Sequence, residues 1–220
     1  MISIVTGHYG SGKTEFALNL ALKKKAEGER VTICDLDIVN PYFRTSDVKN
    51  FLSEKGINVV ASEFASSNVD IPVLPSEILS VFADGGTEAV FDVGGDEDGA
   101  VALGGFFNYI KNKEYKMYFV INAMRPMTAN EDDILELAHK IEETSRLKIT
   151  DVVNNTNLAY LTEPSHILNS AELIEKCAEK LGTGVTYISG KKEILDKIPQ
   201  KNKHFELETF MNLPFNLKIY

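Results

Sequence analysis

The sequence has few cysteines and no long apolar run. Its two cysteines, Cys34 and Cys177, lie 143 positions apart, so they form neither a CxxC pair nor a disulfide framework. We expect both to be buried thiols without a redox or metal-binding role. No stretch of the chain approaches the roughly 20 apolar residues that cross a bilayer. The sequence therefore predicts no association with a membrane.

Basic residues are scarce in the first half of the chain. Residues 1–110 carry 8 basic and 16 acidic side chains, residues 111–220 carry 15 and 16, and the net charge is −9. Because nucleic-acid binding depends on Lys and Arg that neutralise phosphates, this balance argues against a nucleic-acid partner. The first residues, Met1 to Val5, show neither a basic segment nor a cleavage site, so we expect no signal peptide and a cytoplasmic location.

Short apolar runs alternate with helical patterns along the chain, as a parallel sheet requires. The predicted strands are residues 2–6, 31–34, 58–61, 89–92, 117–122, 151–154 and 185–189. The predicted helices are residues 14–27, 46–54, 76–82, a segment from a capping box at 128–131 to about residue 143, and 170–181. The pattern predicts an α/β fold, a three-layer α/β/α domain with a mostly parallel sheet of about seven strands.

Residues 7–14, GHYGSGKT, match the phosphate-loop pattern G-x-x-x-x-G-K-[ST] between a predicted strand and a predicted helix. Glycines in such a loop let successive N–H groups point at phosphate oxygens, while the lysine reaches the β- and γ-phosphates and the Ser/Thr hydroxyl coordinates Mg²⁺. The predicted nucleotide-binding residues of this segment are Gly7, Gly10, Ser11, Gly12, Lys13, Thr14 and Glu15. We expect residues 1–220 to form a single nucleotide-binding domain, with a core of residues 1–190 on which residues 191–220 pack.

Aspartates follow two of the other predicted strands. Asp35 and Asp37 end the second strand, and their side chains point the same way only if the strand continues through Asp37. Asp35 fits a structural hydrogen bond as well as a functional role. Asp92 ends an apolar strand, which is the Walker B pattern of a carboxylate that holds Mg²⁺. Gly94 follows and would let the backbone approach the γ-phosphate, so it is a further predicted nucleotide-binding residue. These motifs therefore predict Thr14 and Asp92 as metal-binding residues.

These three segments, GHYGSGKT at 7–14, DLD at 35–37 and FDVGG at 91–95, resemble the MinD/ParA/CobQ-type P-loop NTPases of the SIMIBI class. The resemblance covers about residues 1–190 and implies ATP and Mg²⁺ as cofactors and, in many members, a nucleotide-dependent homodimer. By similarity, Lys13 and Asp37 are the catalytic residues. Asp37 would position the attacking water or a metal-bound water, so the resemblance adds it to the predicted metal site. The resemblance also implies an asparagine that reads the base, here Asn155 or alternatively Asn154, although a turn asparagine fits equally well.

The sequence departs from this family at one position of the phosphate loop. Many relatives carry a signature lysine there that reaches a partner's phosphates, and this sequence has His8. A neutral imidazole does not replace a permanent cation, so the departure bears on dimer formation and on hydrolysis. Arg44 and Arg125 are candidates for this charge, although an exposed arginine without such a role is the commoner finding.

Three functions fit the sequence. The first is an Mg²⁺-dependent ATPase that acts as a switch on an unidentified partner protein, in the maturation of an enzyme or metallocentre. The second is a small-molecule kinase or an ATP-dependent enzyme similar to dethiobiotin synthetase. The third is a nucleotide-binding module with little turnover. ATP, rather than GTP, is implied by the resemblance, since the sequence has no N-K-x-D guanine reader.

Overall fold

The computed structural model describes residues 1–37, 49–61, 76–83, 86–95 and 97–210. Within these ranges eight strands form one sheet, and all neighbouring strands run parallel. The strands are β1 (Ile2–Thr6), β2 (Val31–Leu36), β3 (Asn58–Ala61), β4 (Glu88–Val93), β5 (Tyr115–Ile121), β6 (Asp151–Asn154), β7 (Val185–Gly190) and β8 (His204–Glu206). The predicted α/β fold is therefore confirmed.

The strands lie in the order β3-β2-β4-β1-β5-β6-β7-β8. β1 is central, because it pairs with β4 on one side and with β5 on the other. The chain thus builds one half of the sheet from β2 to β4 and the other half from β5 to β8. In open parallel sheets, ligands bind beyond the carboxyl ends of the strands where the order reverses in this way. The fold therefore favours a site just after Thr6.

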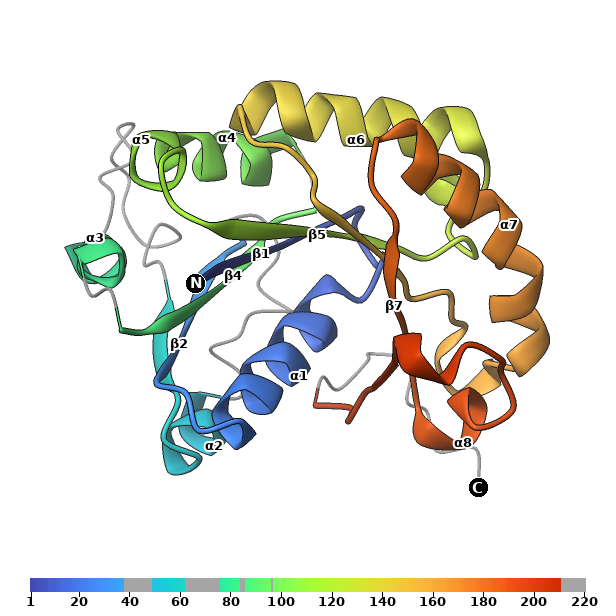
Figure 1. The fold of residues 1–220 in the computed structure, drawn as a ribbon, viewed down its shortest axis with the longest axis horizontal. Helices are drawn as coiled ribbons and strands as arrows, with labels where there is room; N and C mark the ends of the chain where they lie inside the picture. The colour runs from blue at the N-terminus through green and yellow to red at the C-terminus, as the bar shows by residue number, and fades with distance from the viewer. Residues whose placement is uncertain (38–48, 62–75, 84–85, 96, 211–220) are drawn as a thin grey trace.

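Helices cover both faces of the sheet (Figure 1). α1 (Lys13–Ala26) and α2 (Lys49–Glu54) lie on one face, and α4 (Glu97–Gly105), α5 (Phe107–Ile110) and α6 (Glu131–Ser145) lie on the other. The remaining helices are α3 (Ser76–Ala83), α7 (Pro164–Lys180) and α8 (Lys192–Leu195), with 3₁₀ turns at η4 (Pro126–Thr128), η5 (Ala159–Leu161) and η6 (Lys201–Lys203). This gives the predicted three layers.

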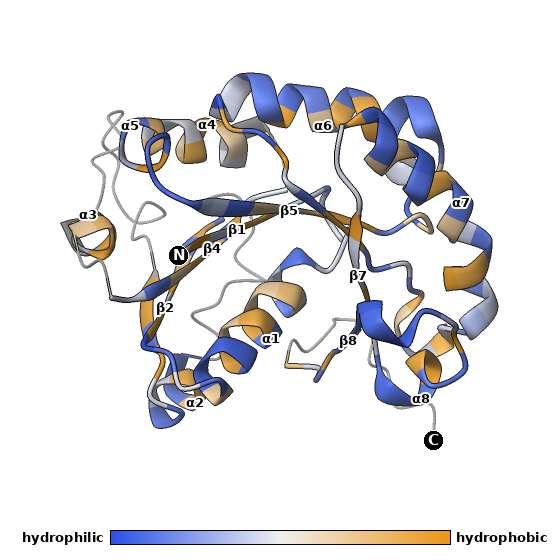
Figure 2. Cartoon of the chain, viewed as in Figure 1, coloured by the Kyte–Doolittle hydropathy of each residue, from blue (hydrophilic) through white to orange (hydrophobic). Residues whose placement is uncertain are grey.

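The side chains of each central strand alternate between two apolar layers. In β5, Met117, Phe119 and Ile121 pack with residues of α4 and α6, whereas Tyr118 and Val120 pack with residues of α1. Figure 2 shows the strands as largely hydrophobic and the outer surface of α6 as largely hydrophilic. Strands that are buried on both faces explain why the sequence shows continuous apolar runs rather than alternation.

All seven predicted strands are confirmed, with ends that differ by two residues or fewer. β8 was not predicted, because it has three residues and one buried apolar side chain, Phe205. The Phe205 ring packs against Phe16 of α1, with ring centroids 4.8 Å apart and the ring planes tilted by 44°. Cys34 and Cys177 are buried, as the sequence predicts.

The predicted helix starts need two corrections. The capping box at residues 128–131 is wrong: Asn130 caps α6, its side chain accepting from the Asp133 amide at 3.0 Å, while the Thr128 hydroxyl donates to the Asn122 carbonyl. α7 begins at Pro164, six residues before the predicted start, because Glu163 and His166 form a capping box there. The predicted start of α2, residues 46–48, lies outside the described residues. α4 and α5 were not predicted.

Candidate functional site

A glycine-rich loop joins the carboxyl end of β1 to the start of α1. Gly7, Gly10 and Gly12 have φ angles of +151°, +74° and +85°, a backbone region that glycine adopts readily. Close contacts add a second reason for glycine, since a Cβ on Gly7 would lie 2.3 Å from the Val120 carbonyl oxygen. Inside the loop, the Ser11 amide donates to the His8 carbonyl at 3.0 Å. The loop has the curled backbone that the phosphate-loop pattern predicts.

Two residues at the start of α1 are buried beside the aspartates at the end of β2. Lys13 and Thr14 are both 4% exposed. The Lys13 ammonium lies 3.5 Å from Asp37 Oδ2. Asp35 has a different role, because its Oδ1 accepts the backbone N–H of Asp37 at 3.0 Å and so fixes the turn where β2 ends. The structure therefore gives Asp35 and Asp37 different contacts. The sequence left open whether Asp35 forms a structural hydrogen bond or has a functional role.

Asp92 lies at the end of β4, beside Val5 of β1 in the sheet register. Its side chain is fully buried, and neither carboxylate oxygen has a hydrogen-bond partner among the described residues. Burial raises the pKa of this carboxyl to about 8; the Lys13 ammonium opposes the rise and the Asp35 carboxylate adds to it. Asp92 is therefore a buried carboxyl whose burial outweighs the favourable effect of Lys13 and Thr14, and a bound cation would favour its charged form.

The arrangement fits a nucleotide with Mg²⁺. Buried polar groups almost always have partners, yet the Ser11 hydroxyl, like Asp92, has none in the part of the chain that the structure describes. No group of three or more His, Cys, Asp or Glu side chains in the same part could hold a metal ion. Mg²⁺ is commonly held by one or two carboxylates together with phosphate oxygens and water, so Thr14 and Asp92 would need a bound phosphate to complete the site.

The Asn155 side chain supports the phosphate loop through a hydrogen bond. Its Nδ2 donates to the Ser11 carbonyl at 2.7 Å, and its Oδ1 accepts from the Ser189 hydroxyl at 2.9 Å. Asn154 is likewise engaged, with its Oδ1 accepting from the Thr156 amide at 3.1 Å. The structure thus brings Asn155 to the predicted site but gives its side chain a supporting position. That Asn155 reads the base stays a prediction.

Glu15, in the first turn of α1, contacts the C-terminal segment. Its carboxylate oxygens accept the backbone N–H of Phe210 at 3.0 and 3.1 Å. One turn later, Asn19 exchanges two hydrogen bonds with the backbone of Glu208, at 2.8 and 2.9 Å. The sequence did not predict these contacts, because the groups that Glu15 and Asn19 bind are backbone groups, which leave no residue pattern. Residues 207–210 are therefore attached to the helix that begins at Lys13.

The segment after β4 packs against the phosphate loop. Gly94 is buried, and a Cβ on Gly95 would lie 2.6 Å from the Tyr9 amide nitrogen and 3.0 Å from the Gly7 carbonyl oxygen. His8, at the position of the signature lysine, has its Nδ1 2.9 Å from the Tyr9 carbonyl oxygen. Of the candidate substitute cations, Arg44 lies outside the described residues, and Arg125 lies on the loop, its Nε donating to the Gly10 carbonyl at 3.1 Å.

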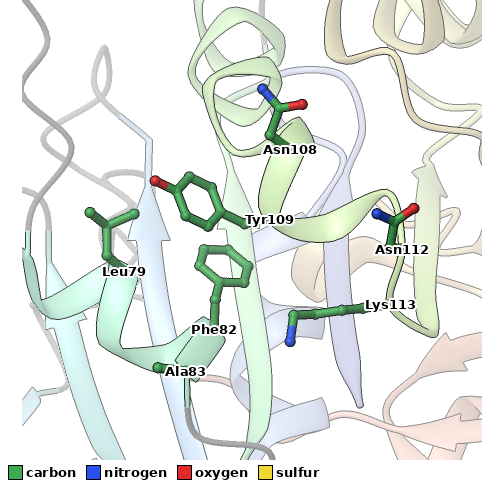
Figure 3. Close-up of a pocket in the computed structure, with 7 residues that line it drawn as sticks. All are labelled: Leu79, Phe82, Ala83, Asn108, Tyr109, Asn112 and Lys113. Atoms are coloured by element: carbon green, nitrogen blue, oxygen red, sulfur yellow. The ribbon is translucent and has the colours of Figure 1, made fainter.

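Figure 3 shows the residues that line a cavity of about 450 Å³. It is lined by Leu79, Phe82, Ala83, Asn108, Tyr109, Asn112 and Lys113. Ala83 precedes β4 and Lys113 precedes β5, so the cavity lies near the amino edge of the sheet, whereas the loop lies at the carboxyl edge. The cavity is therefore separate from the candidate site.

Among the described residues, none of the helices combines the length and the apolar character that a membrane span needs.

Comparison with known proteins gives matches in solved structures alone. No family model matches the chain, and no curated protein matches it. The cell division protein FtsY from Thermotoga maritima is 18% identical with a TM-score of 0.57, covering 96% of this chain and 65% of that one. The signal recognition particle receptor FtsY from Elizabethkingia anophelis, in complex with GDP, is 15% identical with a TM-score of 0.57, covering 95% and 59%.

The signal recognition particle 54 kDa protein from Aeropyrum pernix, in complex with GDP, is 19% identical with a TM-score of 0.55, covering 96% of this chain and 43% of that one. This chain thus spans between 43% and 65% of the length of these three proteins. At such identities the likeness concerns the fold alone. The chain has the P-loop NTPase fold that its sequence predicts.

Proposed function

We propose that this chain is a SIMIBI-class protein that binds a nucleoside triphosphate, ATP by the sequence resemblance, together with Mg²⁺, and hydrolyses it. The observation that carries the proposal is the phosphate loop at the end of β1, with Lys13 and Thr14 buried beside Asp37 and Asp92. The buried Ser11 hydroxyl and Asp92 carboxylate, which lack partners among the described residues, support a ligand at this place.

The ion pair between Lys13 and Asp37 supports a division of roles. Asp37 holds the ammonium beside the loop at 3.5 Å, ready for the β- and γ-phosphates. Once Lys13 also binds phosphate, the Asp37 carboxylate can accept a hydrogen bond from the attacking water and orient it. Mg²⁺, when bound by Thr14, Asp92 and the phosphates, supplies positive charge that offsets the charge on the phosphate oxygens.

We further propose that the nucleotide state is passed to a partner protein or to a second copy of this chain. Gly95 lies directly against Tyr9 and Gly7, so we expect a movement of the phosphate loop to affect the segment after β4. Loss of a phosphate from the phosphate loop would then displace the segment after β4, which is how switch segments respond to the nucleotide. The proposed setting, maturation of an enzyme or metallocentre, rests on the resemblance alone.

The binding proposal is tested by calorimetric titration of the protein with ATP, GTP, ADP and GDP, each with Mg²⁺ and with EDTA. We expect Mg²⁺-dependent binding that is lost in Lys13→Ala. Lys176→Ala is the control, because Lys176 is an exposed helix lysine paired with Glu172. Since two similar structures hold GDP, the ATP and GTP titrations decide the base directly. Unchanged affinity in Lys13→Ala would show that the site is assigned wrongly.

The hydrolysis proposal is tested with Asp37→Asn. This variant keeps the shape of the side chain but lacks the charge that orients water, so we expect it to bind nucleotide and lose turnover. Phosphate release is measured with the parent as reference. Native mass with and without Mg²⁺ and a nonhydrolysable ATP analogue tests the homodimer: a shift to twice the mass supports a second copy as partner, and a nucleotide-bound monomer contradicts it.

A further inference from the structure

Arg125 reaches from the loop after β5 to the phosphate loop after β1. Its Nε donates to the Gly10 carbonyl at 3.1 Å. The guanidinium carbon and Nη2 lie 3.5 and 3.7 Å from the position that a Cβ on Gly10 would occupy. The residue is exposed, and in the described ranges no hydrogen bond or ion pair occupies its two terminal nitrogens. The guanidinium therefore uses one of its three nitrogens on the loop and leaves two for another group.

The backbone that carries Arg125 is held in place. The Asn122 carbonyl accepts the Arg125 amide at 3.1 Å, and the Asn122 side chain accepts the Met124 amide at 3.0 Å. Pro126 follows and disfavours helical angles for the residue before it. Arg125 accordingly has extended angles, φ −99° and ψ 138°. The side chain thus starts from a fixed position, which lowers the entropic cost of holding a ligand.

Among the described residues around Lys13, carboxylates outnumber cations. Lys13 is buried near Asp35, Asp37 and Asp92, and it already pairs with Asp37. Asp35 and Asp37 remain beside this ammonium in the described part of the chain even when Asp92 is protonated. A nucleoside triphosphate brings several more negative charges, so its binding becomes favourable only when other cations join. Mg²⁺ supplies two charges, and a guanidinium on the edge of the loop supplies a third.

We propose that Arg125 is a phosphate-binding residue, held on Gly10 through Nε while its two terminal nitrogens bind the polyphosphate of the nucleotide. Guanidinium is suited to this task, because its planar donors match phosphate oxygens and its charge is permanent. Arg125 then supplies within one chain a cation that His8 does not supply. The proposal rests on the proposed nucleotide-binding function and adds a specific residue to it.

The variant Arg125→Gln separates the two parts of the side chain. Glutamine places its Nε2 at the same distance along the chain as the arginine Nε, so it retains a donor for the Gly10 carbonyl. It lacks the charge and the two terminal nitrogens. We expect its melting temperature without nucleotide to match the parent, and its affinity for MgATP and MgGTP to fall about tenfold or more.

Arg146→Gln is the matched control. Arg146 also donates to a glycine carbonyl, that of Gly104 at 2.6 Å, but it follows α6 on another part of the protein. Arg146→Gln also removes one positive charge from the chain, and we expect its affinity for MgATP and MgGTP to match that of the parent. Parental affinity in Arg125→Gln would overturn the proposal, since a neutral support for the loop would then suffice. An equal loss in both variants would also overturn it, as an effect of net charge. A parent protein that binds no nucleotide would overturn the proposed function itself.

Discussion

Asn155, which follows β6, donates from its side-chain Nδ2 to the backbone carbonyl of Ser11 in the phosphate loop, at 2.7 Å. The same side chain accepts from the Ser189 hydroxyl of β7. The buried Asn155 side chain therefore bonds a residue that lies 144 positions earlier in the chain. The phosphate loop is held from the second half of the sheet as well as by its own turn.

Asn155→Asp tests whether this amide supports the loop or reads the base. The aspartate keeps the acceptor for Ser189 but replaces the donor to Ser11 with a carboxylate oxygen. Because a buried carbonyl loses its partner and faces a negative charge, we expect the affinities for MgATP and MgGTP to fall together, by about tenfold or more. Titration calorimetry measures both.

Ser189→Ala is the control for Asn155→Asp, since it removes one donor and leaves the Ser11 contact intact. Its effect on affinity is expected to be smaller than that of Asn155→Asp. A variant in which the affinity for one base changes and the other does not would contradict the supporting role. It would favour Asn155 as the residue that reads the base.

Gly95→Ala tests the contact between the segment after β4 and the phosphate loop. A Cβ on Gly95 would meet the Tyr9 amide nitrogen at 2.6 Å and its Cα at 2.9 Å, both backbone atoms that cannot rotate away. We expect lower nucleotide affinity and a loss of unfolding free energy of about 1–3 kcal/mol, measured by urea denaturation. Gly184→Ala is the control, because a Cβ there meets no atom within 4 Å. Equal stability of the two variants would show that the two segments are not in firm contact.

Much of the fold could be predicted from the sequence, because buried parallel strands leave continuous apolar runs. The phosphate loop could be predicted for a different reason: its glycines are dictated locally, as the left-handed angle of Gly12 shows. Lys13 and Asp92 could likewise be predicted from sequence motifs, and the structure brings both to one edge of the sheet.

The rest depends on contacts between distant segments, which no local pattern records. The sequence named Asn155 and Arg125 as candidates but not their bonds to backbone carbonyls of the phosphate loop, because a carbonyl has no residue identity that a sequence could reveal. β8 was missed for a similar reason, since its three residues gain their place by pairing with β7 and by packing on Phe16. The early start of α7 depends on a glutamate cap, which is an uncommon choice.

Asp92→Asn tests the buried carboxyl through the pH dependence of stability. Its pKa is about 8 in the folded protein, against the ordinary 3.8 of an unfolded chain. Between these values the folded state binds a proton that the unfolded state has lost, so this group makes stability fall as pH rises toward 8, with no further change above it. The slope contributed by one group is at most about 1.4 kcal/mol per pH unit.

Urea denaturation of the parent and of Asp92→Asn at several pH values between 5 and 9, without nucleotide, isolates this contribution. The difference in unfolding free energy between the two proteins is expected to move in favour of the variant as pH rises, and to level off above pH 8. A difference that stays constant over this range would mean that Asp92 titrates in the folded protein as it does in the unfolded chain.

Asn19→Ala tests the attachment of the C-terminal segment to α1. The Asn19 amide donates to the Glu208 carbonyl at 2.9 Å and accepts the Glu208 amide at 2.8 Å, so the substitution removes both bonds at once. Because residue 208 is exposed, water replaces part of what is lost, and we expect a fall in unfolding free energy of only about 1 kcal/mol. Local opening is the more sensitive measure: hydrogen exchange at the Glu208 and Phe210 amides should accelerate at least about fivefold. Asn169→Ala, on the exposed face of α7, is the control and should leave the exchange of both amides unchanged. Unchanged exchange in Asn19→Ala would mean that Glu15 and the aromatic contacts hold the segment without Asn19.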